Sequence, residues 1–217
     1  MTERLWERQR RELIEAIRER GIDDLTVLRA FDEVPRHLFL PAAVHHRAYQ
    51  DAPLPIGFRQ TASQPSLQAL YLQTLKLEPT ERVLEIGTGS GFQTALLAQL
   101  AANVYSIERV RELSVRARAV LDQLRIPNIA LLVGDGTIGW SKYAPYDAIL
   151  VTAGAPGPPQ ALLDQLSPTG RMLIPIGDRD TQVLRLYRRT DAGVIHEDVT
   201  DCAFVPLLGR FGWPAQS

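Results

Sequence analysis

The sequence predicts an α/β fold, a doubly wound and mostly parallel sheet with an N-terminal helical addition and an antiparallel C-terminal edge. Three observations predict it. Short apolar runs alternate with amphipathic segments after Pro79. A glycine-rich turn follows the first of these runs. Two strand-like runs near the C-terminus are joined by the turn-like segment Asp191-Ala192-Gly193. With 217 residues, 45% of them hydrophobic, we expect a single domain over residues 1–217.

Residues 1–80 are expected to form an N-terminal helical and loop region that precedes a sheet core over residues 81–217. The pattern of Thr2–Arg20 is that of an amphipathic helix, and Gly21 supplies its stop. Asp24 can cap a second helix, which ends before Pro35. Three apolar residues of this second helix are expected to share one face: Leu25, Leu28 and Phe31.

The segment Arg36–Pro65 loses regular periodicity and is rich in proline, so we expect a loop there. A proline-studded segment of this length inside a compact domain is more often functional than idle. A helix over Ser66–Leu77 then leads into the core.

In the core, strands and helices are expected to alternate. The expected parallel strands are Val83–Ile86, Val104–Ile107, Ile129–Val133, Ala148–Thr152 and Arg171–Ile176. Between them we expect helices at Gln93–Ala101, Val110–Leu124 and Pro159–Leu166. The C-terminal edge is expected to contain the strands Gln182–Arg188, Val194–Asp198 and Ala203–Leu208.

Composition excludes several classes of partner. The 24 basic and 25 acidic residues nearly balance, so the chain has no bulk charge that would attract nucleic acid or an anionic membrane. Its single cysteine, Cys202, cannot form an internal disulfide, and there is no cysteine cluster for zinc, so we expect no metal site. Because no apolar run is long enough to span a membrane, we expect a cytoplasmic protein, and we expect a monomer.

The glycine turn indicates a nucleotide-type cofactor. Gly87, Gly89 and Gly91 alternate, whereas the dinucleotide fingerprint needs its third glycine three residues after the second. No lysine follows as in a P-loop. Glu85 would repel a pyrophosphate but suits a cation, and S-adenosylmethionine carries a sulfonium and no phosphate. These features favour S-adenosylmethionine as the cofactor. The alternative is a nicotinamide dinucleotide, and a chain that binds it would be an oxidoreductase.

Two acidic residues at later strand ends extend the predicted site. Glu108 can accept hydrogen bonds from ribose hydroxyls at the tip of the second strand. Asp135, between Gly134 and Gly136, is suited to accept from an adenine amino group. The alternative is that Asp135 belongs to an ordinary Asp-Gly turn.

Motifs over nearly the whole chain resemble one family, the protein-L-isoaspartate (D-aspartate) O-methyltransferases. The glycine turn is generic to methyltransferases, whereas the proline-rich segment before it and the Phe-Val-Pro-Leu run near the end are more specific. The matching segments are Val34–Phe39, Asp51–Gly57, Gln60–Pro65, Val83–Thr94, Gly134–Gly136, Tyr146–Thr152 and Phe204–Leu207.

The resemblance implies a Rossmann-like methyltransferase fold and the repair of damaged proteins. The family transfers a methyl group from S-adenosylmethionine to the free α-carboxylate of an L-isoaspartyl or D-aspartyl residue, with S-adenosylhomocysteine as product. The labile ester closes to a succinimide, which hydrolyses partly to normal aspartate. Damaged proteins and peptides would then be the partners.

The resemblance also assigns roles by position. Ser63 would be the active-site hydroxyl, with Thr61 and Gln60 in the same loop. Its alternative role is the N-cap of the following helix. The residues that would hold the cofactor are Glu85, Gly87, Thr88, Gly89, Gly91, Glu108, Arg109, Asp135 and Gly136. Val205, Pro206 and Leu207 would help to form the slot for the substrate backbone.

Two positions depart from the family pattern. Arg59 stands where glycine is usual before Gln60, and Ala203 stands where arginine is usual before Phe204. We expect Arg59 to face the same pocket as Ser63 and to bind substrate. If positions 59 and 203 are close in space, Arg59 can replace the missing guanidinium for a substrate carboxylate; if they are far apart, substrate recognition has drifted. The alternatives are a methyltransferase that acts on another carboxylate or small molecule, and a cofactor-binding module without catalysis that uses the Arg59 loop as an interaction surface.

Overall fold

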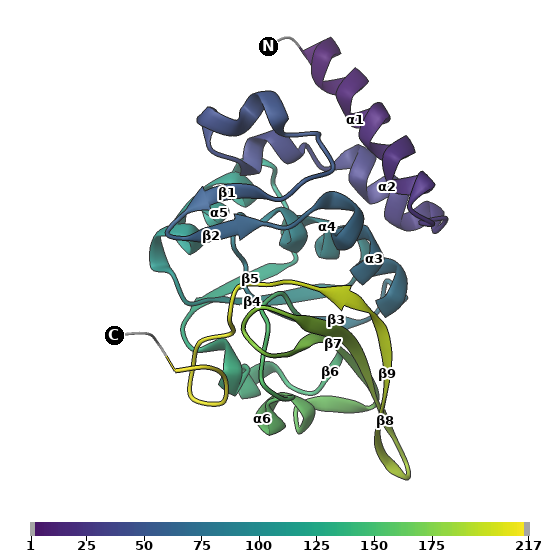
Figure 1. Cartoon of the computed structure of the whole chain (residues 1–217), viewed down its shortest axis with the longest axis vertical. Coiled ribbons are helices and arrows are strands. Elements are labelled where there is room, and N and C mark those ends of the chain that lie inside the picture. Colours follow the sequence, from purple (N-terminus) through teal and green to yellow (C-terminus); the bar gives the residue numbers. More distant parts are fainter. Residues whose placement is uncertain (1–2, 215–217) are drawn as a thin grey trace.

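The computed structural model describes residues 3–214, and in it a seven-stranded sheet carries helices on both faces (Figure 1). Its parallel strands are β3 (Arg82–Ile86), β4 (Asn103–Glu108), β5 (Ile129–Val133), β6 (Tyr146–Val151) and β7 (Leu166–Gly177). They lie in the order β5-β4-β3-β6-β7. The chain direction around the sheet reverses between β3 and β6, which opens a crevice at their carboxyl ends. The predicted doubly wound, mostly parallel fold is confirmed.

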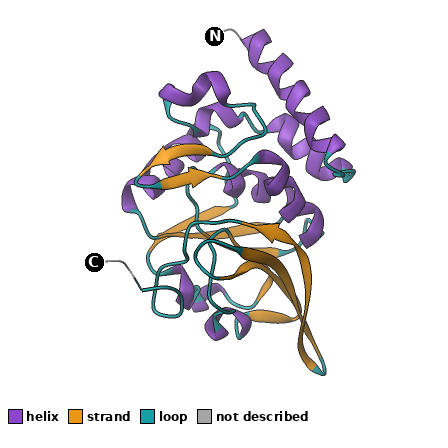
Figure 2. Ribbon diagram, viewed as in Figure 1, coloured by secondary structure: helices purple, strands orange, loops and turns teal. Residues whose placement is uncertain are grey.

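The predicted antiparallel edge is also confirmed. Strands β8 (Gln182–Thr190) and β9 (Gly193–Cys202) form a long hairpin that continues the sheet beyond β7 (Figure 2). The expected strand over Ala203–Leu208 is wrong, because only Pro206 and Leu208 of this run form isolated bridges, with Gly154 and Trp213. A proline has no N–H for a ladder, which limits such a segment to sparse pairing.

Helices α4 (Phe92–Leu100) and α5 (Arg111–Gln123) pack on one face of the sheet, and the short helix α6 (Gln160–Leu163) packs on the other. Alternate strand residues supply two cores: Val83 faces the first, and Leu84 faces the second. Burial on both faces explains why these strands are continuous apolar runs. None of the helices described between residues 3 and 214 has both the length and the apolarity to cross a bilayer.

The N-terminal addition contains α1 (Glu3–Glu19), α2 (Leu25–Glu33) and α3 (Pro65–Leu75). Thr2, where the sequence predicts that the first helix begins, lies outside the described residues. The Asp24 carboxylate accepts hydrogen bonds from the backbone N–H groups of residues 26 and 27, as predicted for a cap. Leu28 and Phe31 of this helix are buried, whereas Leu25, in the first turn next to the cap, is 74% exposed.

Residues 36–65 are more regular than the expected loop. They contain 3₁₀ segments at Arg36–Phe39 and Ala42–Arg47, then a hairpin of β1 (Leu54–Gly57) and β2 (Gln60–Ala62). The hairpin turn places Phe58 and Arg59 at φ values of 53° and 57°. Glycine, asparagine and aspartate are the usual residues at such positions, so a Phe-Arg pair gives no sequence signal for this turn.

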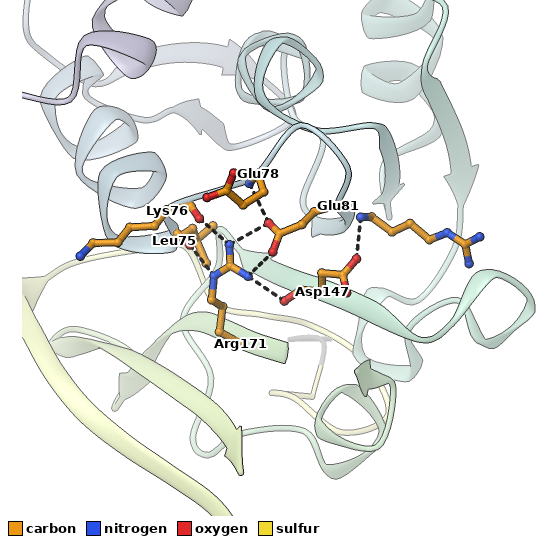
Figure 3. A network of polar contacts seen from close by, with 7 residues as sticks. Leu75, Lys76, Glu78, Glu81, Asp147 and Arg171 are labelled. Carbon is orange, nitrogen blue, oxygen red and sulfur yellow. Dashed lines mark hydrogen bonds and ion pairs between the residues drawn. The ribbon is translucent and has the colours of Figure 1, made fainter. Parts of the chain in front are cut away.

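Arg171 of β7 ties the C-terminal end of α3 to the sheet (Figure 3). Its guanidinium donates to the carbonyl oxygens of Leu75, of Lys76 at 2.8 Å and of Asp147 at 3.2 Å. It also donates to both carboxylate oxygens of Glu81, at 2.7 and 2.8 Å. This arginine therefore ties the C-terminal end of α3 to β7 and to the segment that precedes β3.

Candidate active site

The glycine turn between β3 and α4 lies at the carboxyl end of the central strand. Gly89 and Gly91 have φ values of 55° and 88°, where side chains with a Cβ are strained. A Cβ on Gly91 would lie 2.9 Å from the Cβ of Ala117, so this glycine allows α4 and α5 to pack closely. Gly91 therefore has a packing role and does not line the cavity.

Glu108 ends β4 beside this turn. One of its carboxylate oxygens accepts from the Gly89 N–H and the other from the Val110 N–H, each at 2.8 Å. The residue is only 6% exposed, yet it lines the cavity. The two backbone donors hold the carboxylate as a fixed acceptor at the tip of the strand.

An open cavity lies over the carboxyl ends of β3, β4 and β6, between the glycine turn, the β1-β2 hairpin and the segment that follows β9. Most residues that the sequence singles out line this cavity: Gln60, Thr61, Ser63, Gly87, Thr88, Gly89, Glu108, Arg109, Gly136, Val205, Pro206 and Leu207. Four others do not contribute to the lining: Arg59, Glu85, Gly91 and Asp135.

A second cavity adjoins the first. It runs between α3 and the residues that end β9, and it shares four lining residues with the first cavity: Thr61, Ser63, Thr152 and Val205. Ser63 therefore stands where the two cavities meet. A reacting group could reach Ser63 from either side.

The proposed capping role of Ser63 is wrong. Helix α3 begins at Pro65 with Gln64 as its N-cap. The first turn is capped from outside by Asp51, whose carboxylate accepts from the Ser66 N–H at 2.8 Å and from the Gln64 side-chain amide at 2.9 Å. The Ser63 hydroxyl is thus not needed to begin the helix.

Glu85 does not reach the cavity and is completely buried beneath it. Its Oε2 accepts from the Thr94 and Ser106 hydroxyls at 2.5 and 2.6 Å. Burial raises the pKa of Glu85 to about 8, against these hydrogen bonds from Ser106 and Thr94, and the charge of Glu108 adds to the rise. The argument from a charged Glu85 is therefore wrong, because the group is largely protonated at neutral pH.

Asp135 is engaged by the protein itself. Its Oδ1 accepts from the N–H and hydroxyl of Thr137 at 2.9 and 2.7 Å, and its Oδ2 accepts from the Arg210 N–H at 2.8 Å. Burial alone would raise its pKa, but these hydrogen bonds from Arg210 and Thr137, with the charge of Arg109, hold the pKa below its usual value. The alternative of a structural turn fits this carboxylate better than an adenine acceptor, whereas the neighbouring Gly136 does line the cavity.

The prediction that Arg59 and Ser63 face the same pocket is wrong, and the condition for compensation between Arg59 and Ala203 is not met. Arg59 is exposed at the tip of the β1-β2 hairpin and lines neither cavity. Ala203 lines only the second cavity. Since the two residues do not share a pocket, Arg59 cannot take the place of a guanidinium at position 203.

Sequence reasoning missed two glutamines. Gln68 of α3 and Gln93 of α4 both line the first cavity although each is 4% exposed. Neither amide atom of Gln93 has a hydrogen-bond partner within residues 3–214. A buried amide with unmet donors and acceptors is costly, so Gln93 marks a place where a polar ligand fits. The only sequence signal was its position in the first turn after the glycines.

Metal chemistry finds no support in the described part of the chain. Residues 3–214 contain no group of three or more histidine, cysteine, aspartate or glutamate side chains that could hold an ion. His37 instead stacks on Trp6 with ring centroids 4.5 Å apart, and its Nδ1 lies 2.8 Å from the Tyr49 hydroxyl.

Comparison with known proteins agrees with this geometry. The family model "Protein-L-isoaspartate(D-aspartate) O-methyltransferase (PCMT)" matches residues 8–212. A protein-L-isoaspartate O-methyltransferase of Geobacter metallireducens is 50% identical over 195 residues, which are 89% of this chain and 90% of the relative. Another, of Trichlorobacter lovleyi, is 49% identical over 210 residues, 96% of this chain and 97% of the relative.

Solved structures are similar over the same span. A protein-L-isoaspartate O-methyltransferase superimposes with a TM-score of 0.85 at 30% identity, covering 94% of this chain and 67% of that one. A Plasmodium falciparum protein described as the same enzyme, in complex with S-adenosyl-L-homocysteine, superimposes with a TM-score of 0.80 at 28% identity, covering 91% and 97%. The chain belongs to the protein-L-isoaspartate(D-aspartate) O-methyltransferase family.

Proposed function

We propose that this chain transfers a methyl group from S-adenosylmethionine to the free α-carboxylate of L-isoaspartyl, and D-aspartyl, residues in damaged proteins. The observation that carries the proposal is the position of Ser63, where two adjoining cavities meet in a member of this family. The first cavity would take the cofactor, and the peptide would lie in the second with its carboxylate reaching into the first beside Ser63.

The lining of the first cavity fits the cofactor. Glu108 offers fixed carboxylate oxygens for ribose hydroxyls, and the glycine turn brings backbone close to the ligand. The unmet amide atoms of Gln93 are suited to the polar amino-acid end. When bound, S-adenosylmethionine supplies a methyl group activated by a positive sulfonium. The cavity lining, together with the family, supports this cofactor even though Glu85 is buried and largely neutral.

A carboxylate substrate explains why the site needs no general base. Its usual pKa is about 4, so it is already a nucleophile at neutral pH. The protein then has to orient the carboxylate and replace its water with a few fixed donors. We assign the Ser63 hydroxyl this orienting role, with Thr61 and Gln60 beside it on β2.

The slot for the peptide backbone is assigned to Val205, Pro206 and Leu207. The carbonyl oxygen of Val205 accepts from the Gly154 N–H, and the Leu207 N–H donates to the Gly154 carbonyl, both at 2.8 Å. These bonds hold the segment beside Gly154, where Val205 lines both cavities and Pro206 and Leu207 line the first. Once the ester forms, the next backbone nitrogen of the substrate attacks its carbonyl carbon and expels methanol, which gives the succinimide.

The setting is proposed as the cytoplasm, with the chain acting as a monomer on damaged proteins. Nearly balanced charge, 24 basic against 25 acidic residues, supports a partner recognised by its backbone and carboxylate more than by bulk charge. Light scattering on a size-exclusion column would measure the oligomeric state.

The proposed function is tested with labelled S-adenosylmethionine and two peptides that differ only in an isoaspartyl or aspartyl linkage. Initial rates are expected to favour the isoaspartyl peptide strongly. Equal rates would refute the repair function while leaving a methyltransferase with a different carboxylate substrate, and label on neither peptide despite cofactor binding would favour a module without catalysis.

A further inference from the structure

We propose that Arg36 is a positioning residue, which holds the Ser63 backbone and the Gln68 amide so that both residues present hydrogen-bond donors to a carboxylate in the first cavity. The inference rests on the proposed function for its substrate. Arg36 itself does not line either cavity, so it would act through the two residues that it contacts.

The contacts of Arg36 are unusual for a buried cation. The residue is 1% exposed. Its Nη1 donates to the Gln68 Oε1 at 2.7 Å, and its Nη2 donates to the Ser63 carbonyl oxygen at 3.1 Å. The guanidinium carbon lies 5.0 Å from the Phe92 ring centroid. No carboxylate among residues 3–214 forms an ion pair with it.

The cation survives at physiological pH despite this setting. Burial lowers the pKa of Arg36 to about 10, and the charge of Asp51 partly opposes that effect. A buried charge that forms no ion pair costs more than an apolar residue of similar volume. Stability alone therefore does not explain an arginine at this position, and its two neutral partners point to another role.

The chemistry of a guanidinium sets the orientation of Gln68. A guanidinium has only donors, so it must face the amide oxygen of Gln68. The Nε2 group of Gln68 is then not used by Arg36 and can donate to another acceptor. Gln68 also lines the first cavity. The second arm of the same guanidinium fixes the carbonyl of Ser63, and hence the peptide that carries the hydroxyl. One buried guanidinium thus contacts two residues of the cavity wall, Gln68 through its side chain and Ser63 through its backbone.

Two carboxylates could use these donors, the α-carboxylate of the substrate and that of the cofactor's amino-acid end. The same chemistry serves both. Loss of the substrate contact would raise KM for the isoaspartyl peptide, whereas loss of the cofactor contact would weaken the binding of S-adenosylhomocysteine measured by calorimetry.

The test compares Arg36→Met, Gln68→Met and the double variant. Each single variant is expected to lower kcat/KM by roughly 10- to 100-fold, the size of effect that a small misplacement of a reacting group produces. The double variant is expected to fall within about threefold of Arg36→Met, because the Gln68 amide acts only within the arrangement that Arg36 holds. Losses that multiply would overturn the proposal.

Arg171→Met is the matched control, because this second buried arginine contacts the opposite end of α3. It is expected to lower the melting temperature at least as much as Arg36→Met while keeping kcat/KM within threefold of wild type. An equal loss of activity in the two variants would reduce Arg36 to a structural role. If Arg36→Met does not fold, Arg36→Lys carries the same comparison, with activity expected between wild type and Gln68→Met.

Failure of the proposed function is separable from failure of this inference. If the wild-type protein methylates no isoaspartyl peptide, the affinity for S-adenosylhomocysteine decides. Weaker binding in Arg36→Met and Gln68→Met, without further loss in the double variant, would support Arg36 as a positioning residue. Unchanged binding in both would overturn it.

Discussion

The two ends of helix α3 are held by buried arginines of opposite kinds. At the C-terminal end, Arg171 meets the carboxylate of Glu81 through two hydrogen bonds and also satisfies the last carbonyl groups of the helix. At the N-terminal end, Arg36 meets only the neutral oxygens of Gln68 and Ser63. The first arrangement is self-sufficient, whereas the second leaves part of its hydrogen-bonding capacity open.

Buried polar atoms without a hydrogen-bond partner occur both near the first cavity and elsewhere in residues 3–214. Arg36, Tyr71, Glu85 and Gln93 each keep at least one buried polar atom that has no hydrogen-bond partner in the described chain. Gln93 lines the first cavity, Arg36 contacts Ser63 and Gln68 of its wall, and Glu85 is completely buried. The remaining unpartnered atoms belong to residues that do not line this cavity, Gln9, Arg10, Ser167 and Trp213. Arg171 thus has a paired, structural setting, whereas the Gln93 amide at the cavity remains available to a polar ligand or to water.

The largest effect is expected at the paired end. Arg171→Met should lower the free energy of unfolding by about 3–5 kcal/mol, because Glu81 would remain partly buried without its cation. Urea unfolding followed by circular dichroism measures this. A loss below about 1 kcal/mol would mean that the carbonyl contacts and the ion pair contribute little to holding α3.

The next effect concerns pH and Glu85. In the folded protein the pKa of Glu85 is about 8, above its usual value of 4.5. The protonated side chain therefore contributes fully to stability below pH 4.5, the pKa in the unfolded chain, and this contribution is lost as the pH rises toward 8. Glu85→Gln should therefore gain stability relative to wild type over that window, by up to about 1.4 kcal/mol per pH unit. Parallel stability curves from pH 5 to 8 would contradict a protonated Glu85.

Substitution of Ser63 is expected to change the free energy of unfolding little but to lower the rate of methyl transfer clearly. Ser63→Ala should lower kcat by about 100-fold, the usual cost of removing one fixed donor to a reacting oxygen. The free energy of unfolding should stay within about 1 kcal/mol of wild type, since the helix is capped by Asp51 and not by this hydroxyl. An unchanged kcat would show that the Ser63 hydroxyl does not orient the reacting carboxylate.

The smallest effect is expected at the hairpin tip. Arg59→Ala should leave kcat/KM for an isoaspartyl peptide within about twofold, because the side chain is exposed and lies outside both cavities. A tenfold loss would restore a substrate contact for Arg59 and show that the hairpin moves when peptide binds.

Much of the fold could be predicted from sequence because its signals are local. The buried strands are continuous apolar runs, and the glycines and Asp24 mark their turns and caps directly. The β1-β2 hairpin could not be predicted, since its turn uses Phe58 and Arg59 in a conformation that neither residue favours.

The site was predictable only where position in the chain fixes position in space. Glu108 and Gly136 follow strand ends, which places them at the cavity. Tertiary neighbours decide three features of the site that the local sequence does not encode. These are the exposure of Arg59, the burial of Glu85 and the hydrogen bonds that Asp135 accepts from the protein. Gln68 and Gln93 were missed because a glutamine in a helix usually faces solvent.

The central claim is that unmet buried polar atoms at the site await a ligand, and Gln93→Met tests it most directly. The unliganded variant is expected to melt at a higher temperature than wild type, because two unpartnered amide atoms are removed from the interior. The same variant should bind S-adenosylhomocysteine about tenfold more weakly in calorimetry, the loss of roughly one hydrogen bond. A lower melting temperature together with unchanged affinity would contradict the account.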